Sequence, residues 1–229
     1  MLILLPPSEG KTAPASGEPV DLSELAFPGL NRTRERLLDV LARLTFPRAL
    51  QYLDVGPGLE AEARRNLTLR SEPAAPASTV YTGVLYEHLG PFSAENVLIA
   101  SALWGFVRST DRIPAYRLSI GATLPRIPSL AALWRDPLRK AMPDEGLIVD
   151  MRSGGYVNAW KPKRATVLSV RAFHDGKTVS HMVKATRGDV ARILLTSGET
   201  PEAPEDVATI VRQAGLTVEL NGRNLDVIA

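Results

Sequence analysis

The pattern of apolar and polar positions predicts a chain in which buried strands and amphipathic helices follow one another. Short, mostly apolar runs that are typical of buried strands lie at residues 1–5, 97–101, 116–120, 146–151 and 216–220. Apolar side chains at helical spacing and cap signals predict helices at residues 31–44, 84–89, 129–141, 187–195 and 204–213. Ser129 is a suitable N-cap for the helix that follows it.

A further turn signal bears on the fold class. The tetrapeptide at residues 174–177 contains Asp-Gly, so residues 166–173 and 178–183 are expected to form a β-hairpin. Strands and helices mix without strict alternation. We therefore expect an α/β or α+β fold, with one mixed-sheet domain and surrounding helices over residues 1–229.

Residues 46–67 contain two helical stretches separated by a Gly56-Pro57-Gly58 turn. This resembles a helix-hairpin-helix, in which the backbone N–H groups of a Gly-x-Gly turn bind a DNA phosphate. Glu60 and Glu62 would repel a phosphate at that place. A plain connection between two helices explains the same pattern, so both interpretations stay open on the sequence alone.

Composition indicates an ordinary globular protein, with 45% apolar and 23% charged residues in a chain of 229. No apolar run approaches the ~18–20 residues that span a membrane. The charged Glu9 and Lys11 follow the apolar start too soon for a secretory signal. We therefore expect a cytoplasmic protein with no membrane partner.

Cysteine is absent from the sequence, which excludes disulfides, thiolate metal sites and cysteine nucleophiles. The three histidines are His88, His174 and His181. His174 and His181 could meet across the expected hairpin, but their spacing matches no known ligand motif. We therefore expect no metal site and no cofactor.

Charge is unevenly distributed although the formal net charge is only +2. Residues 152–187 hold eight Lys and Arg against one acid, whereas residues 189–229 hold seven acids against three Arg. Such an asymmetry gives a nearly neutral protein a positive surface. A surface of this kind attracts phosphates or nucleic acid, and a solvated basic face explains it equally well.

The segment after the first apolar run ends in the Gly-Lys-Thr of a phosphate-binding loop, at residues 10–12. A Walker loop also needs a glycine five positions before Gly10, and this chain has Leu5 there. Prolines at positions 6–7 remove two N–H donors from the stretch that would wrap the phosphates. The segment is therefore not a nucleoside-triphosphatase loop.

What remains is a strand end that presents Ser8, Lys11 and Thr12. Ligands often bind beyond the carboxyl ends of strands, which makes these three residues candidates for a binding site. A surface turn in which Ser8 bonds its own backbone is the alternative.

Four stretches of the chain carry a family resemblance. The first is Ser8-x-x-Lys11-Thr12, where Glu9-Gly10 fills the middle, and the second is Val80-Tyr81-Thr82-Gly83. The third comprises Leu103, Gly105, Arg108, Asp111, Tyr116, Arg117, Leu118 and Gly121. The fourth comprises Ser153, Tyr156, Lys161-Pro162-Lys163, Lys184 and Arg187-Gly188. In order and spacing, these stretches resemble the peroxide stress protein YaaA family.

The resemblance implies a cytoplasmic protein of the peroxide stress response. Such proteins limit oxidative damage to DNA and protein by restraining intracellular iron. It also implies a mixed fold with a positively charged cleft, a helix-hairpin-helix and a DNA-binding activity.

The cleft has two interpretations, of which the first is binding to duplex or distorted DNA. Binding through phosphates would weaken steeply with salt. The residues expected to bind DNA or another anion are Ser8, Lys11, Thr12, Gly56, Gly58, Tyr81, Arg108, Tyr116, Arg117, Ser153, Lys161, Lys163, Lys184 and Arg187. Tyr81, Trp104, Tyr116 and Tyr156 would stack on unpaired bases unless they pack in the core.

In the second interpretation, the cleft is the active site for a small phosphorylated or nucleobase-containing ligand. The candidate catalytic residues are Lys11, Lys184, Tyr156 and Asp150. Arg108 and Arg117 would hold the anion, with Asp111 orienting them or pairing with Arg108 in the interior. No complete triad, carboxylate dyad or metal set assigns a reaction.

Overall fold

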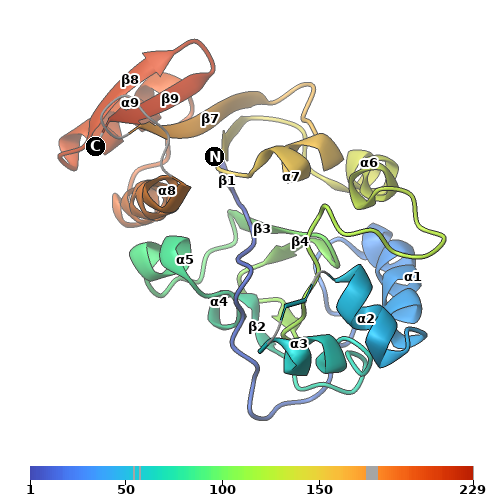
Figure 1. The fold of residues 1–229 in the computed structure, drawn as a ribbon. Helices are drawn as coiled ribbons and strands as arrows, with labels where there is room; N and C mark the ends of the chain where they lie inside the picture. The colour runs from blue at the N-terminus through green and yellow to red at the C-terminus, as the bar shows by residue number, and fades with distance from the viewer. Residues whose placement is uncertain (54, 57, 174–179, 229) are drawn as a thin grey trace.

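A computed structural model describes residues 1–53, 55–56, 58–173 and 180–228 of the chain. Its centre is a seven-stranded sheet in the order β4-β3-β1-β6-β7-β9-β8 (Figure 1). The strands are β1 (Leu2–Leu5), β3 (Val97–Ser101), β4 (Gly105–Arg108), β6 (Leu147–Asp150), β7 (Thr166–Phe173), β8 (Thr217–Asn221) and β9 (Asn224–Ile228). The sheet confirms an α/β fold.

The five inner strands run parallel, and the two edge strands, β4 and β8, run antiparallel to their neighbours. Strands β3 and β6 are buried along their whole length, as is β1 from Ile3 to Leu5. This explains their continuous apolar sequences, because a parallel strand is covered on both faces. In β1, Leu4 pairs with Leu98 on one side and with Asp150 on the other.

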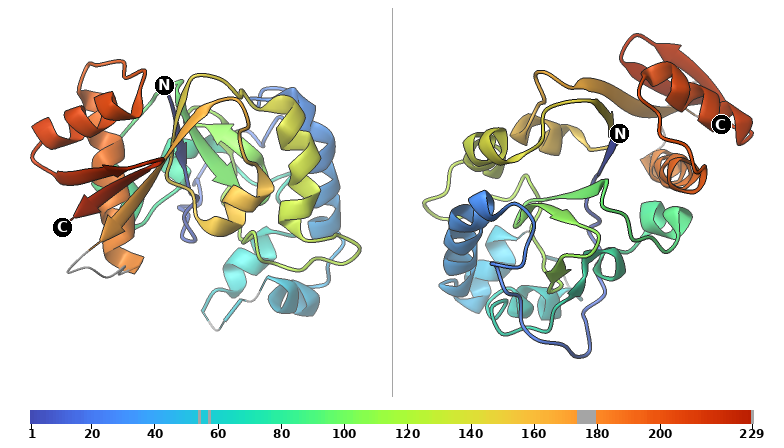
Figure 2. Two further views of the ribbon diagram at one scale, coloured as in Figure 1. Left: turned by 90° about the horizontal axis from the view of Figure 1, so that it is seen from above. Right: turned by 180° about the vertical axis from the view of Figure 1, so that it is seen from behind.

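Nine α-helices of four to seventeen residues surround the sheet in the described part of the chain. They are α1 (Asn31–Ala42), α2 (Phe46–Tyr52), α3 (Glu60–Arg65), α4 (Ala77–Val80), α5 (Val84–Leu89), α6 (Leu130–Ala141), α7 (Gly154–Ala159), α8 (Ser180–Thr196) and α9 (Pro204–Gln213). Helices α5 and α8 lie side by side on one side of β1, and α1 and α6 lie on the other (Figures 1 and 2). A short helical turn, η1 (Pro28–Leu30), and a two-stranded sheet of β2 (Ala75–Pro76) with β5 (Arg112–Ile113) complete the described elements.

The chain leaves β1 and β6 in opposite directions. After β1 it continues to β3 on one side, and after β6 it continues to β7 on the other side. A crevice forms where neighbouring parallel strands diverge in this way, just beyond their carboxyl ends. The ends of β1 and β6 are therefore the place where this topology favours a ligand site.

Two close contacts hold the helices to this framework. The guanidinium of the buried Arg34, on α1, donates to the carbonyl oxygens of Trp104, Ala26 and Phe106 at 2.8–3.0 Å. On the opposite side, α8 approaches α5 at Gly188, where a Cβ would collide with the Leu85 carbonyl oxygen. Glycine at position 188 is therefore a condition of the α5–α8 contact.

Most elements predicted from the sequence are confirmed, with ends that agree to within two residues. The strands at residues 1–5, 97–101, 146–151 and 216–220 are present. The helices at residues 31–44, 84–89, 129–141 and 204–213 are present, and Ser129 accepts the N-cap hydrogen bond from Ala132 N–H. Residues 187–195 are helical as part of the longer α8.

The strand predicted at residues 116–120 is wrong. The Asn66 side chain takes both backbone groups of Arg117: its amide N–H donates to the Arg117 carbonyl, and its oxygen accepts the Arg117 N–H at 2.9 Å. A side chain therefore replaces the neighbouring strand that the apolar pattern suggested. Tyr116 is buried here without belonging to a sheet.

The predicted hairpin is also wrong in its second half. Residues 166–173 form β7, but α8 begins at Ser180. The expected turn and His174 lie outside the described residues. The partner of the last predicted strand is β9, which the sequence pattern did not reveal.

Residues 46–67 form α2 and α3, but the helix-hairpin-helix stays a prediction. Pro57 lies outside the described residues. The Gly58 N–H, which would bind a phosphate, donates instead to the Glu60 carboxylate at 3.0 Å. A phosphate at this turn would have to displace that carboxylate.

We expect Asn66→Ala to destabilise the fold by about 2 kcal/mol, because it leaves two partly buried backbone groups of Arg117 without their hydrogen-bond partners. Urea unfolding would measure the change. The matched control is Asn158→Ala, since Asn158 is exposed, and it should lie within about 0.5 kcal/mol of wild type. Equal stability of both variants would contradict the role given to Asn66.

Candidate functional site

A pocket of about 650 Å³ opens beyond the ends of β1 and β6, where the topology favours a ligand site. Its walls come from the loop after β1, the start of α5, the segment after Tyr116, the start of α7 and the first half of α8. The lining comprises residues 6–11, Leu53, residues 82–86, residues 117–120, Ser153, Tyr156, Lys184 and Arg187. Residues far apart in the sequence thus meet in one cavity.

The loop after β1 is fixed by hydrogen bonds to residues 80–86. The Tyr86 hydroxyl donates to the Pro6 carbonyl at 2.8 Å, and the Thr12 N–H donates to the Val80 carbonyl at 2.9 Å. The Ser8 hydroxyl donates to the Gly10 carbonyl at 2.6 Å and accepts the Thr82 N–H at 3.1 Å. Ser8 therefore bonds its own backbone, as the surface-turn interpretation proposed, and also ties the loop to the opposite wall.

Lys11 is partly buried, and its amine lies among oxygen acceptors and aromatic rings. The Nζ atom donates to the Ser8 carbonyl at 2.7 Å and to the Glu9 carbonyl at 3.3 Å. It stands 4.4 Å from the ring centroid of Tyr116 and 5.4 Å from that of Tyr81. The ring faces attract a cation at this position.

Burial lowers the pKa of Lys11 from its ordinary value of 10.5 to about 7, and the positive charge of Arg117 acts in the same direction. The carboxylates of Glu62 and Glu9 oppose the shift but do not cancel it. A substantial fraction of the amine is therefore neutral near pH 7. Neutral lysine acts as a base or a nucleophile, which the charged form does not.

Three further cations line the pocket. Arg117 pairs with Glu62 at 3.3 Å, and Lys184 is exposed. The Arg187 guanidinium donates to the Val170 carbonyl at 3.3 Å, and burial lowers its pKa while Asp150 opposes the shift. Arginine remains charged in proteins. The lowered pKa of Arg187 therefore means that its cation is partly desolvated, and such a cation favours an anionic partner.

The other acid–base candidates are less available. Both carboxylate oxygens of Asp150 accept from the buried Arg152, at 2.8 and 2.7 Å, so Asp150 is committed to an internal ion pair. Burial, with Tyr116 nearby, raises the pKa of Tyr156 far above its usual range. Tyr156 therefore stays protonated and serves as a hydrogen-bonding group.

Buried aromatic side chains pack in the core next to the Lys11 amine. Tyr81, Trp104 and Tyr116 are at most 3% exposed, and the Tyr81 and Tyr116 hydroxyls lie 2.9 Å apart. The Tyr116 hydroxyl also lies 2.7 Å from Ser101 Oγ. In this structure they pack in the core and do not present a face to unpaired bases, which corrects the stacking hypothesis. The rings instead support the Lys11 amine.

Several sequence candidates lie outside the pocket lining. Arg108 pairs with Glu95 at 3.0 Å, whereas Asp111 accepts the backbone N–H groups of Arg108 and Ala26. Of the two alternatives for Asp111, the ion pair with Arg108 is therefore not the one that the structure shows. Tyr81, Tyr116 and Asp150 also lie outside the lining and are buried. Five further candidates outside the lining are exposed: Thr12, Gly56, Gly58, Lys161 and Lys163.

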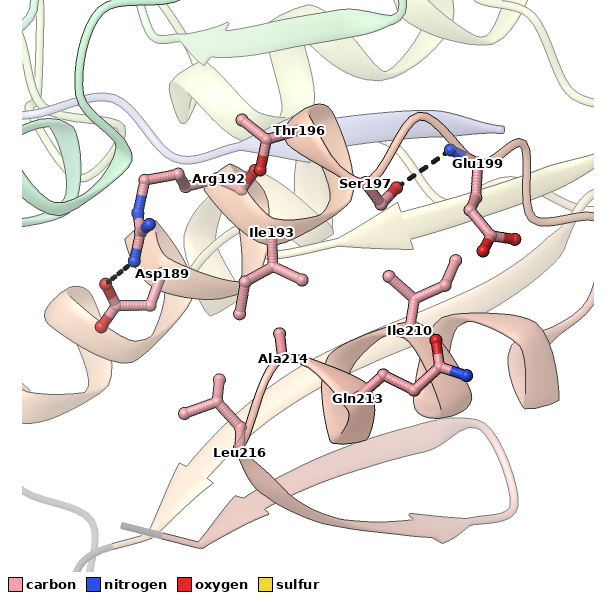
Figure 3. Close-up of a pocket in the computed structure, with 10 residues that line it drawn as sticks. All are labelled: Asp189, Arg192, Ile193, Thr196, Ser197, Glu199, Ile210, Gln213, Ala214 and Leu216. Atoms are coloured by element: carbon pink, nitrogen blue, oxygen red, sulfur yellow. Dashed lines mark hydrogen bonds and ion pairs between the residues drawn. The ribbon is translucent and has the colours of Figure 1, made fainter.

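A second hollow of about 580 Å³ lies between α8 and α9 (Figure 3). Its lining combines apolar side chains with an Arg192–Asp189 ion pair of 3.4 Å. The residues singled out in the sequence do not occur in it. Over the described ranges, no group of three or more His, Asp or Glu side chains is placed to hold a metal ion. None of the described helices is long and apolar enough to cross a membrane.

Comparison with known proteins identifies the family. Residues 1–220 match the family described as "Peroxide stress protein YaaA". The chain belongs to the peroxide stress protein YaaA family. It is 41% identical to the UPF0246 protein SCO2297 of Streptomyces coelicolor, over 96% of this chain and 92% of the relative. It is 42% identical to the UPF0246 protein CE1889 of Corynebacterium efficiens, over 96% of each.

The stretches that carry the YaaA resemblance converge on the pocket. The first contributes Ser8 and Lys11, and the second contributes Thr82 and Gly83. The third and fourth contribute Arg117, Leu118, Ser153, Tyr156, Lys184 and Arg187. The fold thus brings ten residues of this YaaA family signature, drawn from all four stretches, around one cavity.

Sequence reasoning missed two residues of the site. In the sequence Glu62 only argues against phosphate binding, whereas in the structure it pairs with Arg117. Tyr86 carries no motif of its own, yet its hydroxyl fixes the loop at Pro6. Nothing in the local sequence signals either contact, because each joins segments more than fifty residues apart.

The lowered pKa of Lys11 predicts how the stability of this YaaA family member depends on pH. Between pH 7 and 10.5 the folded state binds fewer protons at Lys11 than the unfolded state, so this group makes stability rise with pH. In Lys11→Met, the free energy of unfolding should rise less between pH 6 and pH 9 than in wild type. Each kcal/mol of this pH-dependent stability that the variant lacks should reduce the rise in melting temperature by about 2–4 °C.

Thermal unfolding at several pH values would measure the effect. Lys140→Met is the matched control, since Lys140 is exposed and lies outside the pocket lining. The prediction fails if Lys11→Met and Lys140→Met show the same pH dependence.

Proposed function

We propose that this YaaA family member works in the cytoplasm during peroxide stress and limits iron-dependent oxidative damage by means of a pocket for a small anionic ligand. The observation that supports this most strongly is the convergence of Lys11, Arg117, Lys184 and Arg187 on one cavity. Glu9 is the one acid among the described residues of its lining. Phosphate and carboxylate are the groups that such a set of cations favours.

The size of the pocket supports a small molecule over duplex DNA as its occupant. Ligand pockets for small molecules have volumes of about 300–1,000 Å³, and this one measures about 650 Å³. Arg108, Lys161 and Lys163, which would extend a DNA-binding track, lie outside it. The fit is therefore to a compact ligand that the cavity can surround.

The apolar part of the lining bears on the ligand's class. Leu53, Val84, Leu85, Leu118 and Ile120 line the cavity together with the cations. A molecule with a flat or apolar part and an anionic group would use both surfaces. Phosphorylated and nucleobase-containing compounds have this character.

We expect phosphate-bearing ligands to raise the melting temperature of the protein, in a screen of inorganic phosphate, nucleoside monophosphates and nucleobases. Arg187→Ala should weaken binding by about 10–100-fold, because one charge-assisted contact contributes about 1.5–3 kcal/mol. Arg135→Ala should bind as wild type, since Arg135 is exposed and outside the lining. A screen in which no compound shifts the wild type would count against the proposal.

DNA binding is a second candidate, favoured by the basic stretch from residue 152 to 187. Lys161, Lys163 and Arg164 are exposed there and available to backbone phosphates. In this proposal the DNA lies on the surface outside the pocket. Its affinity would be largely independent of sequence and sensitive to salt.

Fluorescence anisotropy with duplex and bubble DNA would test this candidate. Binding should fall by orders of magnitude between about 50 and 200 mM salt if about six phosphates are contacted. Lys161→Ala with Lys163→Ala should lower the salt slope by about 2. An absence of binding to either DNA at low salt would rule this candidate out.

A further inference from the structure

We propose that the Lys11 amine is a nucleophile that forms an imine with the carbonyl group of a small aldehyde or ketone bearing a carboxylate or phosphate. The inference rests on the proposed anion pocket and names the reactive group that the pocket's ligand would carry. The residues that support it are Lys11, the two carbonyls that hold its amine, and the cations beside it.

The hydrogen bonds of the amine leave the lone pair of its neutral form free to act as a nucleophile. A neutral amine has two N–H groups and one lone pair. Two backbone acceptors, the carbonyls of Ser8 and Glu9, lie within 2.7 and 3.3 Å of Nζ. When both N–H groups are held there, the lone pair is left for an electrophile in the pocket.

The aromatic rings favour the product as well as the resting amine. An iminium formed on Nζ would carry its positive charge where the ammonium now stands, 4.4 Å from the Tyr116 ring centroid. The interaction of that ring face with a cation does not require an N–H group. Tyr116 is fixed by its hydroxyl contacts with Tyr81 and Ser101, so the ring is a rigid support.

The cations next to Lys11 favour an anionic group on the carbonyl compound. Arg117 is close enough to Lys11 for its charge to lower the pKa of the amine, and Arg187 lines the same cavity. A carboxylate next to the carbonyl, or a phosphate a few bonds away, would be held by these guanidinium groups. The substrate class is therefore an anionic carbonyl compound such as a keto acid or a phosphorylated aldehyde.

The step balances without an oxidant or reductant. The Nζ lone pair attacks the carbonyl carbon, and one amine proton moves to the oxygen, which gives a carbinolamine. Loss of that oxygen as water forms the carbon–nitrogen double bond. Tyr156, which lines the pocket and stays protonated, donates a hydrogen bond to the departing oxygen. The proton with which that oxygen leaves as water comes from solvent.

The charged and titratable groups around Lys11 set the pH at which it reacts. Arg117 and Tyr116 face it from the segment after β5, Glu62 from α3, Tyr81 from the end of α4, and Glu9 from its own loop. Their combined effect with burial leaves the pKa of the amine at about 7. Imine formation should therefore reach half its maximal rate near neutral pH.

Reductive trapping on the full chain tests the proposal. Wild-type protein is incubated with pyruvate or glyoxylate and sodium cyanoborohydride, and the modified lysine is located by peptide mass spectrometry. The adduct adds the mass of the acid less one oxygen atom. Because the sequence has six lysines, each site can be quantified. We expect Lys11 to be labelled at least tenfold more than any other lysine at pH 7.

Three variants sharpen the result. Lys11→Arg keeps the charge and should abolish the adduct, with folding checked by circular dichroism and melting temperature. Lys140→Arg should label as wild type. Arg187→Ala should reduce trapping of glyoxylate at least tenfold while leaving trapping of uncharged acetaldehyde at Lys11 unchanged.

Equal labelling of all lysines, or a half-maximal rate above pH 10, would overturn the proposal. The failure is distinguishable from that of the anion pocket. If phosphate compounds stabilise wild type but Lys11 is not trapped, the imine step alone is rejected. If neither occurs, the pocket proposal is rejected with it.

Discussion

The parallel pairing of β1 with β3 on one side and β6 on the other is the constraint on which the site depends. Because the chain leaves β1 and β6 in opposite directions, it opens a crevice at their carboxyl ends. The loop that follows β1 must then turn inside that crevice. The two prolines and the hydrogen bonds of Ser8 and Tyr86 give the turn one shape, and Lys11 ends in the cavity wall.

The site concentrates positive charge at some cost in solvation. Burial and Arg117 disfavour the ammonium of Lys11, while two carbonyls and two ring faces partly compensate it. Arg187 is likewise partly desolvated. Cations that lack full solvation gain most from an arriving anion, since the anion replaces water that burial has already removed. The same balance keeps a fraction of Lys11 neutral, which is the form that the proposed imine step requires.

The sequence predicted those parts of the fold that local pattern controls. The apolar runs of β1, β3 and β6 are readable because both faces of these strands are covered, and Ser8 and Lys11 follow directly from the end of β1. The strand predicted at residues 116–120 does not form, because the side chain of Asn66, fifty-one positions from Arg117, hydrogen-bonds the Arg117 backbone. Residues 180–183 were predicted as a strand but belong to α8, and the same helix packs against α5 at Gly188. Charge and the family resemblance place Arg108 and Lys161 with the site in the sequence, but only the topology decides which cations share a cavity.

The state of the Lys11 amine is the central claim, and it can be measured directly. The six lysines can be labelled with carbon-13 at Cε and followed by NMR as the pH is raised, with Lys11→Arg identifying the Lys11 signal. We predict a Lys11 titration midpoint near pH 7. A midpoint near the ordinary lysine value of about 10.4 would contradict it.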